Sequence, residues 1–338
     1  MRLVTEQELR EVVDEDGSLQ AVEDAFRALA EDRVEQPPPM GFEFPETAGE
    51  VHVKGAAIRG SPIFVVKIAS GFYRNPEQNL PASSGLVLVF DQTTGFPDAL
   101  FQDNAYLTEM RTAAAGALAA RLLAHETVKK MAVLGSGAQA RYQLRAIRRV
   151  RDIKNVVAWS PTRANRDLYC REMETELGLG CTPADTAEDA VDDATLVLSV
   201  TTARSPIVRA DAVSKSATII AVGSDGPDKQ ELDAKILAHA DKVVVDRLSQ
   251  CVRLGEVHHA IEAGLMSEED VYAELGDVLI GKKPGREGDE LIVCDLTGVG
   301  VQDAAIAELA WRGLSGKASA RLDPATLRDE NKAPGSTR

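Results

Sequence analysis

The sequence predicts an α/β protein in which a Rossmann dinucleotide-binding domain follows an α+β amino-terminal domain. The chain has 338 residues, which is more than one hydrophobic core usually serves. Short apolar strands alternate with helices after about residue 126, as in a parallel sheet covered on both faces. Before that point, short runs of strand-forming residues are separated by turn residues, which is typical of hairpins.

The first domain is expected over residues 1–125. Residues 1–33 have the pattern of two amphipathic helices that break near Asp16-Gly17, and the prolines at 37–39 end them because proline cannot continue a helix. An Ala-rich helix is expected over 105–124. Strands are expected between these helices, at Glu50–Lys54, Ile63–Ile68 and Gly85–Phe90.

The second domain is expected over residues 126–312, and residues 313–338 are expected to return to the first domain. Helices are predicted over 138–150, 163–177 and 302–312, the last of which can lead the chain back. The apolar strands of this domain are expected at Met131–Leu134, Asn155–Trp159, Leu196–Val200, Thr218–Val222, Lys242–Val245 and Leu291–Cys294.

Charge and composition exclude several classes of partner. The chain has 38 basic and 53 acidic residues, a formal net charge of −15. Such a surface repels phosphate backbones and anionic lipids, so we expect neither nucleic acid nor a membrane as a partner. No stretch approaches the ~18 apolar residues of a membrane helix. The charged start lacks the apolar segment of a signal peptide, so a cytoplasmic protein is expected.

The cysteines do not have the spacing of a metal site. No C-x-x-C pair occurs, and no histidine lies at zinc-finger spacing from them. We therefore expect no metal, and interpret the cysteines as buried small apolar side chains. They are Cys170, Cys181, Cys251 and Cys294.

A glycine-rich loop is the strongest local signal for a cofactor. The strand Met131–Leu134 runs directly into Gly135-Ser-Gly137-Ala-Gln-Ala140, which opens a helix. The first glycine allows a tight turn, the second lets the backbone approach a pyrophosphate, and the small Ala140 lets helix and strand pack closely. The free N–H groups of the helix then attract phosphate. The loop residues expected to contact a dinucleotide are Gly135, Ser136, Gly137, Ala138 and Gln139.

The end of the second strand leaves the choice of nicotinamide cofactor open. NAD sites usually have a carboxylate there that binds the ribose 2′-hydroxyl. This chain has Ser160, Thr162 and Arg163 instead, and these could contact a 2′-phosphate. NADP(H) is therefore possible beside NAD(H).

These segments together resemble the ornithine cyclodeaminase/mu-crystallin family over nearly the whole chain. The resemblance implies a homodimer in which the first domain dimerises and holds substrate while the second holds NAD(P). Members act on α-amino or α-imino acids. The segments that carry the resemblance are Val66–Gly71, Leu107–Gly116, the loop Gly135–Ala140, Ala221–Leu232, Asp295–Gly298 and Gln302-Asp303.

The resemblance also implies roles for individual residues. Lys67 and Arg111 would hold the substrate carboxylate, for which a guanidinium fork and an ammonium are suited. Asp225 ends an apolar strand and would meet the substrate nitrogen, with proton transfer and iminium stabilisation as its task. Lys67 and Asp225 are thus the expected catalytic residues. Further cofactor contacts are expected from Thr112, Thr201, Val222 and Gly223.

The chain departs from the cyclodeaminase pattern before Lys67. Cyclodeaminases carry a glutamate there that holds the distal amine of ornithine, whereas this chain has His52 and Lys54 on one strand face. A cation would repel an ammonium side chain but suits a second carboxylate. Ornithine is therefore disfavoured as the substrate.

A branch resemblance suggests a specific substrate. Residues 50–54, 246–250 and 254–259 resemble ectoine-utilisation members and iminosuccinate reductases. The expected reaction is the NAD(P)H-dependent reduction of iminosuccinate to L-aspartate. An ammonia-releasing cyclodeaminase that uses NAD catalytically and a non-enzymatic, crystallin-like NADP- or ligand-binding protein are the alternatives. His258 and His259 are expected at the surface or an interface.

Overall fold

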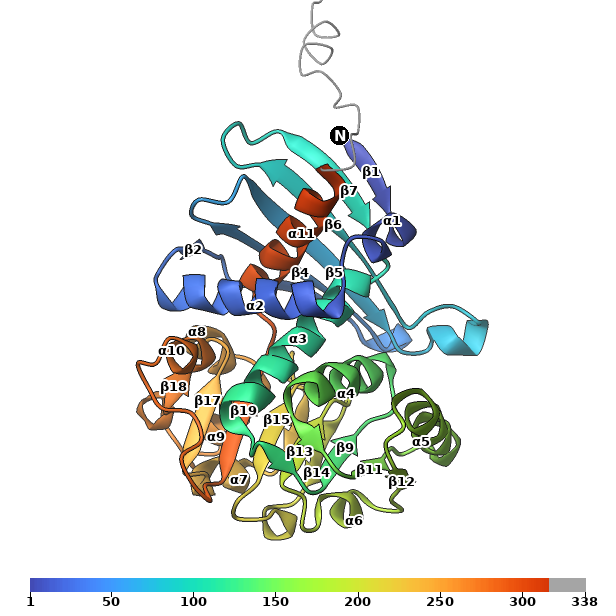
Figure 1. The fold of residues 1–338 in the computed structure, drawn as a ribbon, viewed down its shortest axis with the longest axis vertical. Helices are drawn as coiled ribbons and strands as arrows, with labels where there is room; N and C mark the ends of the chain where they lie inside the picture. The colour runs from blue at the N-terminus through green and yellow to red at the C-terminus, as the bar shows by residue number, and fades with distance from the viewer. Residues whose placement is uncertain (316–338) are drawn as a thin grey trace, which may run out of the picture.

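The computed structural model describes residues 1–315, and its amino-terminal part is built on a mixed sheet (Figure 1). The strand order is β1-β7-β6-β5-β4-β2, and β3 also pairs with β4. β1 and β7 are parallel, while the other pairs are antiparallel. The strands are β1 Arg2–Thr5, β2 Val34–Glu35, β3 Met40–Phe44, β4 Gly49–Ile58, β5 Ile63–Phe72, β6 Ser83–Asp91 and β7 Pro97–Gln102.

Helices cover one face of this sheet. α1 (Glu6–Arg10) and α2 (Glu15–Ala30) lie between β1 and β2 in the chain, and α3 (Tyr106–Leu123) follows β7. α11 (Gly300–Ser315) packs against α2, β4 and β5, so the chain contacts this sheet again at its far end. That contact begins before residue 313, where the sequence prediction put the return. The predicted return segment lies outside the described residues from position 316 onward.

The second part is a sheet in which every strand pair is parallel, with the order β12-β11-β9-β13-β15-β19-β17-β18. Strand order reverses at β9, and ligands of such sheets bind outside the carboxyl ends of the strands at that point. The strands are β9 Met131–Leu134, β11 Val156–Trp159, β12 Cys181–Pro183, β13 Leu196–Ser199, β15 Thr218–Ala221, β17 Lys242–Val245, β18 Ala273–Glu274 and β19 Ile292–Asp295. Two small parallel pairs are β8 Thr127–Val128 with β10 Asp152–Ile153 and β14 Arg204–Val208 with β16 Gln230–Leu232.

Helices on both faces complete the Rossmann architecture (Figure 1). They are α4 Ala138–Val150, α5 Arg163–Leu177, α6 Ala187–Val191, α7 Ala234–His239, α8 Leu248–Cys251, α9 Gly255–Glu262 and α10 Leu275–Leu279. α3 of the first part packs along α4, which joins the two parts. The predicted α/β class is confirmed. The four cysteines are buried, as interpreted from the sequence.

Several predicted elements needed correction. Residues 1–33 begin with a strand, and the helix break falls at residues 11–14 rather than at Asp16-Gly17. The reason is local: the Asp14 side chain accepts a hydrogen bond from the Gly17 N–H and caps α2, so Asp16 and Gly17 lie in its first turn. The strands observed within residues 49–91 are longer than the sequence predicted. The strands β1, β3 and β7 were not predicted.

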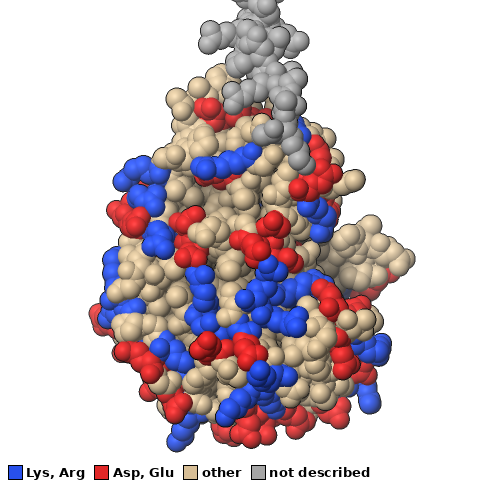
Figure 2. Space-filling view, in the orientation of Figure 1, with Lys and Arg blue, Asp and Glu red and all other residues tan. Residues whose placement is uncertain are grey.

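The surface mixes both signs of charge. On the face drawn in Figure 2, basic side chains lie among acidic ones, so the net charge of −15 does not gather there in one acidic field. Among residues 1–315, no helix combines the length and the apolar character needed to cross a bilayer.

Candidate active site

Three buried cations converge at the junction of the two parts. Lys54 on β4 and Lys67 on β5 are direct cross-strand partners, so both side chains leave the same face of the sheet. α3 brings Arg111 to that face. All are at most 6% exposed. The predicted substrate-binding cations are thus brought together.

A single carboxylate from α11 contacts two of these cations. Asp303 Oδ1 lies 2.8 Å from Lys67 Nζ and 3.0 Å from Arg111 Nε. Arg111 Nη1 also donates to Gln302 Oε1 at 2.9 Å. Burial raises the pKa of Asp303, but Lys67 and Arg111 outweigh this effect and lower it, so the carboxyl is ionised. Burial and Arg111 together lower the pKa of Lys67 to about 7.

Lys54 has no carboxylate partner at hydrogen-bond distance among the described residues. Its ammonium donates to the carbonyls of Gly298 at 2.6 Å and Thr297 at 3.1 Å. Burial, with Arg111 as the next cause, lowers the pKa of Lys54. Gly298 has a φ of +77°, and a Cβ there would lie 2.7 Å from Arg111 Nη1, so this turn requires glycine. The three cations therefore have one carboxylate in direct contact, that of Asp303, while Asp225 and Asp246 act on Lys54 from farther away.

Polar atoms in this cluster lack hydrogen-bond partners. Within residues 1–315, Asp303 Oδ2, Gln302 Nε2 and His52 Nε2 are buried and accept or donate no hydrogen bond. Unsatisfied buried groups are uncommon in native proteins and cost free energy. Other buried side-chain atoms without partners lie elsewhere in the described residues, but those of Asp303 and Gln302 belong to the side chains that contact Lys67 and Arg111 and could bind a polar ligand.

Asp225 follows β15 and lies close to the same cluster. Its Oδ1 accepts from Lys229 Nζ at 2.7 Å, and Lys229 Nζ also lies 2.6 Å from Glu50 Oε1 on β4. Tyr73 donates to the same Glu50 oxygen, and His52 Nε2 lies 3.7 Å from it. Burial raises the pKa of Asp225, but Lys229, His52 and Lys54 lower it far more, so Asp225 is a carboxylate.

The glycine loop fits a pyrophosphate. Gly135 has a φ of +115°, and a Cβ there would lie 2.7 Å from the Val200 carbonyl oxygen, so the turn after β9 needs glycine. Gly137 is the N-cap of α4, and a Cβ there would meet no atom within 4 Å. The space before the helix N-terminus is therefore free on the side where the backbone N–H groups point. These residues fit a dinucleotide.

The other predicted cofactor residues line the carboxyl edge of the sheet. Ser136 donates to Ser160 at 2.9 Å, which joins the loop to the end of β11. Glu231 accepts from the N–H and hydroxyl of Thr201 and from the N–H of Gly223, so one buried carboxylate orders the loops after β13 and β15. Val222 precedes this glycine and is buried.

The remaining ones lie at the starts of α4 and α5, except Thr112, which lies within α3. Thr162 is the N-cap of α5, while Arg163 has a side chain that is 81% exposed and lies 3.8 Å from Asp167. Ala138 and Gln139 open α4. Gln139 Nε2 donates to the Glu109 carbonyl at 3.1 Å and to its carboxylate, which joins α4 to α3. Burial raises the pKa of Glu109 to about 7. Thr112 on α3 donates its hydroxyl to the Thr108 carbonyl.

The sequence prediction missed four members of the site. Asp303 and Gln302 were part of the family resemblance but received no role, although they carry the carboxylate and the amide nearest the cations. Glu50 shares the strand face of His52 and Lys54 at the two-residue spacing, and this period could have revealed it. Tyr73 carried no signal in the sequence, since only the fold brings it to Glu50.

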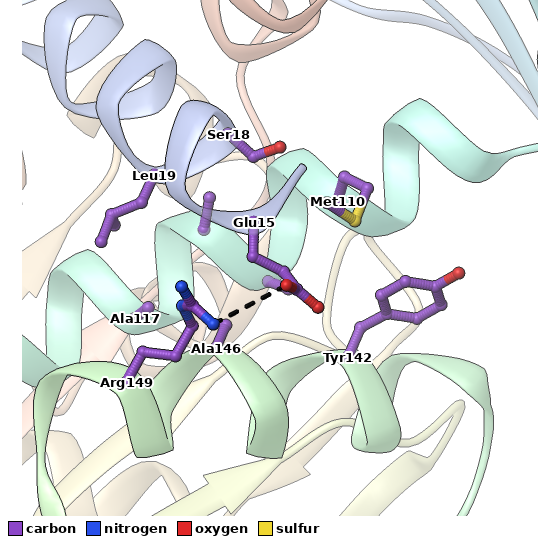
Figure 3. Close-up of a pocket in the computed structure, with 10 residues that line it drawn as sticks. Glu15, Ser18, Leu19, Met110, Ala117, Tyr142, Ala146 and Arg149 are labelled. Carbon is purple, nitrogen blue, oxygen red and sulfur yellow. Dashed lines mark ion pairs between the residues drawn. The ribbon is translucent and has the colours of Figure 1, made fainter. Parts of the chain in front are cut away.

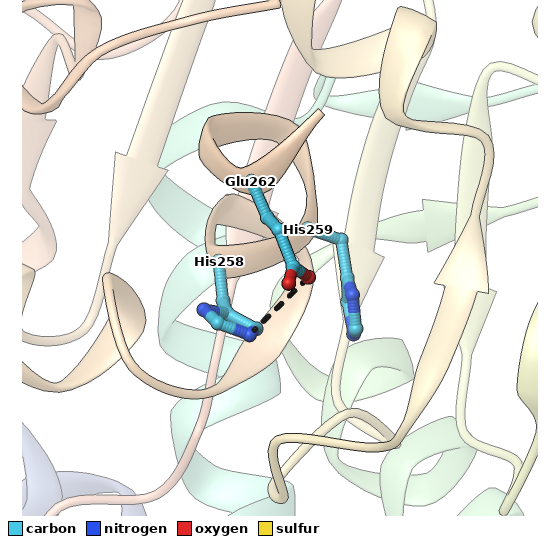
Figure 4. Close-up of side chains that lie close together, drawn as sticks. All are labelled: His258, His259 and Glu262. Atoms are coloured by element: carbon cyan, nitrogen blue, oxygen red, sulfur yellow. Dashed lines mark ion pairs between the residues drawn. The ribbon is translucent and has the colours of Figure 1, made fainter. Parts of the chain in front are cut away.

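Two other features lie outside the group of buried cations. Figure 3 shows the crevice where α2, α3 and α4 meet, with an ion pair between Arg149 and Glu15; its volume of about 10 Å³ leaves no room for a substrate. Figure 4 shows His258, His259 and Glu262 side by side on α9. One ring nitrogen of each histidine and one carboxylate oxygen of Glu262 lie within 4.8 Å of one another.

Comparisons with known proteins match nearly the whole chain. The model of the ornithine cyclodeaminase/mu-crystallin family matches residues 1–317. An uncharacterized cyclodeaminase of Sinorhizobium fredii is 41% identical, with 92% of this chain and 95% of that protein covered.

Solved structures are similar over both domains. An archaeal alanine dehydrogenase dimer with bound NAD is 34% identical, with a TM-score of 0.87 and 95% of this chain and 98% of that one covered. The iminosuccinate reductase of Paracoccus denitrificans in complex with NAD⁺ is 30% identical, with a TM-score of 0.85 and 94% and 97% covered. The chain belongs to the ornithine cyclodeaminase/mu-crystallin family.

Proposed function

We propose that this protein is an NAD(H)-dependent imino-acid reductase that converts iminosuccinate to L-aspartate. The observation that supports this most is the excess of buried positive charge, since Lys67 and Arg111 have one carboxylate between them and Lys54 donates to backbone carbonyls. A dianion would neutralise that excess, whereas a distal ammonium would meet repulsion. The relatives crystallised with NAD support the choice of NAD(H).

The mechanism assigns one task to each group. Arg111 and Lys67 hold the α-carboxylate, and Lys54 holds the second carboxylate. Bound NADH supplies the hydride that reduces the imine carbon. Asp225 faces the nitrogen, and its lowered pKa favours stabilising a protonated imine over donating a proton. Lys67, with a pKa of about 7, is suited to proton transfer at neutral pH.

Lys54→Gln tests the substrate. We expect kcat/KM for iminosuccinate, formed from oxaloacetate and ammonia, to fall by ~30- to 1000-fold, the effect of removing one partner of a buried charge pair. The imine of pyruvate lacks the second carboxylate, so its turnover should change much less. NADH oxidation measured with each 2-oxo acid and ammonia gives the ratio of the two kcat/KM values.

Lys154→Gln is the matched control, because Lys154 forms an exposed ion pair with Asp152 far from the cluster. Equal losses for both substrates in Lys54→Gln would remove Lys54 from substrate selection. Unchanged turnover would remove it from the site.

The alternatives differ in stoichiometry. A cyclodeaminase releases ammonia from a diamino acid with no net change in NADH, and the Glu50 carboxylate is the group here that would attract the distal ammonium. Glu50 is already engaged by Lys229 and Tyr73, which weighs against that role. A binding protein would bind NADH and turn over no imine at all.

We also propose a homodimer formed through the uncovered face of the amino-terminal sheet. Val66 and Leu88 are cross-strand partners on that face, and the neighbouring pair Phe64 and Phe90 stacks at 4.8 Å. The helices cover the opposite face (Figure 1). These apolar side chains are partly exposed, and a contiguous apolar patch of this kind marks an interaction surface. The alanine dehydrogenase relative is described as a dimer, which supports this proposal.

Leu88→Lys tests the dimer. A charge in an apolar interface should convert most of the protein to monomer at micromolar concentration, measured by light scattering after size exclusion. Leu168→Lys is the control, because Leu168 is an exposed leucine on α5 of the other domain. A Leu88→Lys protein of dimer mass would exclude this face as the interface.

A further inference from the structure

A buried ionic cluster joins the two domains beside the proposed substrate site. Its centre is the ammonium of Lys229, which follows β15 in the nucleotide-binding domain. Around it lie Asp225 from the same loop and Glu50 and Tyr73 from the amino-terminal sheet. Lys229 is 4% and Glu50 5% exposed, so solvent screens their interaction little.

The ammonium contacts every one of these groups. Lys229 Nζ lies 2.6 Å from Glu50 Oε1, 2.7 Å from Asp225 Oδ1 and 3.2 Å from the Tyr73 hydroxyl oxygen. It also lies 5.6 Å from the centre of the Tyr73 ring, within cation–π range. The three hydrogen bonds match the three donors of an ammonium group.

Removing this ammonium would leave two carboxylates facing each other. Carboxylate oxygens of Glu50 and Asp225 lie within 4.8 Å of one another. Burial and the charge of Asp225 act to raise the pKa of Glu50, although His52 and Lys229 lower it overall. The other charged or titratable groups facing the two carboxylates are His52, Lys54 and Tyr73. Among the described residues, Lys229 is the cation that hydrogen-bonds both carboxylates. It therefore compensates a repulsion between Glu50 of one domain and Asp225 of the other.

The backbone of Lys229 is also held in place. Its carbonyl accepts from the Ser224 hydroxyl and, at 2.7 Å, from His259 Nε2 on α9. Figure 4 shows His259 on that helix. The lysine is therefore anchored within the nucleotide-binding domain, while its ammonium reaches the opposite domain.

We propose that Lys229 is an interdomain clasp, a positioning residue that aims Asp225 at the substrate and holds the two domains in the arrangement seen in the structure. The role of Asp225 toward the substrate nitrogen rests on the proposed function. The clasp itself rests only on the contacts of Lys229 with the two domains.

Lys229→Met, Lys229→Arg and the double variant Lys229→Met/Glu50→Gln test the effect on Asp225. We expect Lys229→Met to lower kcat/KM by ~100-fold at pH 7, since the buried Glu50 and the partly exposed Asp225 lose their shared counter-charge. The loss should deepen as pH falls, because the pKa of Asp225 rises when Lys229 is absent and the carboxylate becomes protonated. In the wild type, the acidic limb of the pH profile, where Asp225 becomes protonated, lies below the pH range of the assay.

The other two variants separate charge from packing. Lys229→Arg keeps the cation and should recover most of the activity and the flat acidic limb. The double variant removes the repelling Glu50 charge as well, so its acidic limb should move back toward that of the wild type. A purely structural lysine would give equal losses at every pH and no recovery in the double variant, and this result would overturn the proposal for Asp225.

Small-angle scattering of the free protein tests the domain arrangement without turnover. Lys229→Met should have a larger radius of gyration than the wild type, and the double variant should not. Arg149→Ala is the matched control, because Arg149 forms an exposed ion pair with Asp16 across the same two domains, far from the cluster. It should scatter and turn over substrate as the wild type does.

These measurements are independent of the substrate assignment. An unchanged radius of gyration in Lys229→Met would overturn the clasp even if iminosuccinate is reduced. Conversely, failure to reduce iminosuccinate would overturn the proposed function, while the scattering difference would still support the clasp.

Discussion

Lys67→Met should lower kcat/KM for imine reduction by ~10³-fold. Lys67 is the buried cation that contacts Asp303 and lies beside Arg111 and Lys54. Under the proposed function, its loss removes a substrate-carboxylate contact and a proton-transfer group at once. Removing one partner of a buried, hydrogen-bonded charge pair costs about 4 kcal/mol, which corresponds to that factor. Steady-state NADH oxidation measures it.

The control for this variant is a second buried lysine. Lys242 on β17 is 7% exposed and pairs with Glu287 and Glu290, away from the site. Lys242→Met should lower the thermal stability about as much as Lys67→Met does. It should leave kcat/KM of the folded enzyme unchanged. If both variants lost activity equally, the effect of Lys67→Met would be one of folding rather than catalysis.

The pKa of Lys67 also leads us to expect a pH dependence of activity. Burial and Arg111 lower its pKa to about 7, so the ammonium is present below that pH and is lost as pH rises through it. A substrate carboxylate binds the ammonium, so kcat/KM of the wild type should fall above pH 7, by at most tenfold per unit. Lys54 also lowers this pKa, so Lys54→Gln should move the alkaline limb to higher pH.

Gly137→Val should abolish cofactor binding while the protein still folds. The φ of Gly137 is −79°, which valine adopts, and a Cβ there meets no atom of this chain. The valine side chain would fill the space before the α4 N-terminus. We expect the dissociation constant for NADH to rise by at least ~100-fold, about 3 kcal/mol, with a stability change below ~1 kcal/mol. Fluorescence titration and thermal unfolding measure these quantities.

Gly135→Ala is the contrasting variant. At a φ of +115°, with the Val200 carbonyl 2.7 Å from a Cβ, alanine strains the turn itself, so stability and NADH binding should both fall. The two variants together separate occupancy of the pyrophosphate space from folding of the loop. NADH affinity in Gly137→Val equal to that of the wild type would contradict the assignment of this loop.

The sequence was informative wherever the signal is local. The loop from Gly135 to Ala140 is contiguous, and its glycines are required by backbone conformation alone. Alternating strands and helices likewise predicted the parallel sheet. Residues 1–33 show the limit of such reasoning: a strand at Arg2–Thr5 pairs in parallel with Pro97–Gln102, and nothing in either segment encodes a partner so distant in the chain.

The same distinction between local and distant signals applies to the residues of the site. Lys67, Arg111 and Asp225 were predicted, because each lies in a motif that resembles a family. The partners of these residues were not: Asp303 neutralises Lys67 and Arg111 from a helix near the carboxyl end, and Lys229 compensates Glu50 and Asp225 across two domains.

The amino-acid sequence by itself determined the α/β class, the nucleotide loop and the cations of the site. Only the tertiary structure decided which charges face one another and which polar atoms lack a partner. The physical reason is that secondary structure and turn geometry depend on neighbouring residues. Burial and the distance between charges depend instead on how segments hundreds of residues apart are packed, and these quantities set the pKa of Lys67 and the ionisation of Asp225.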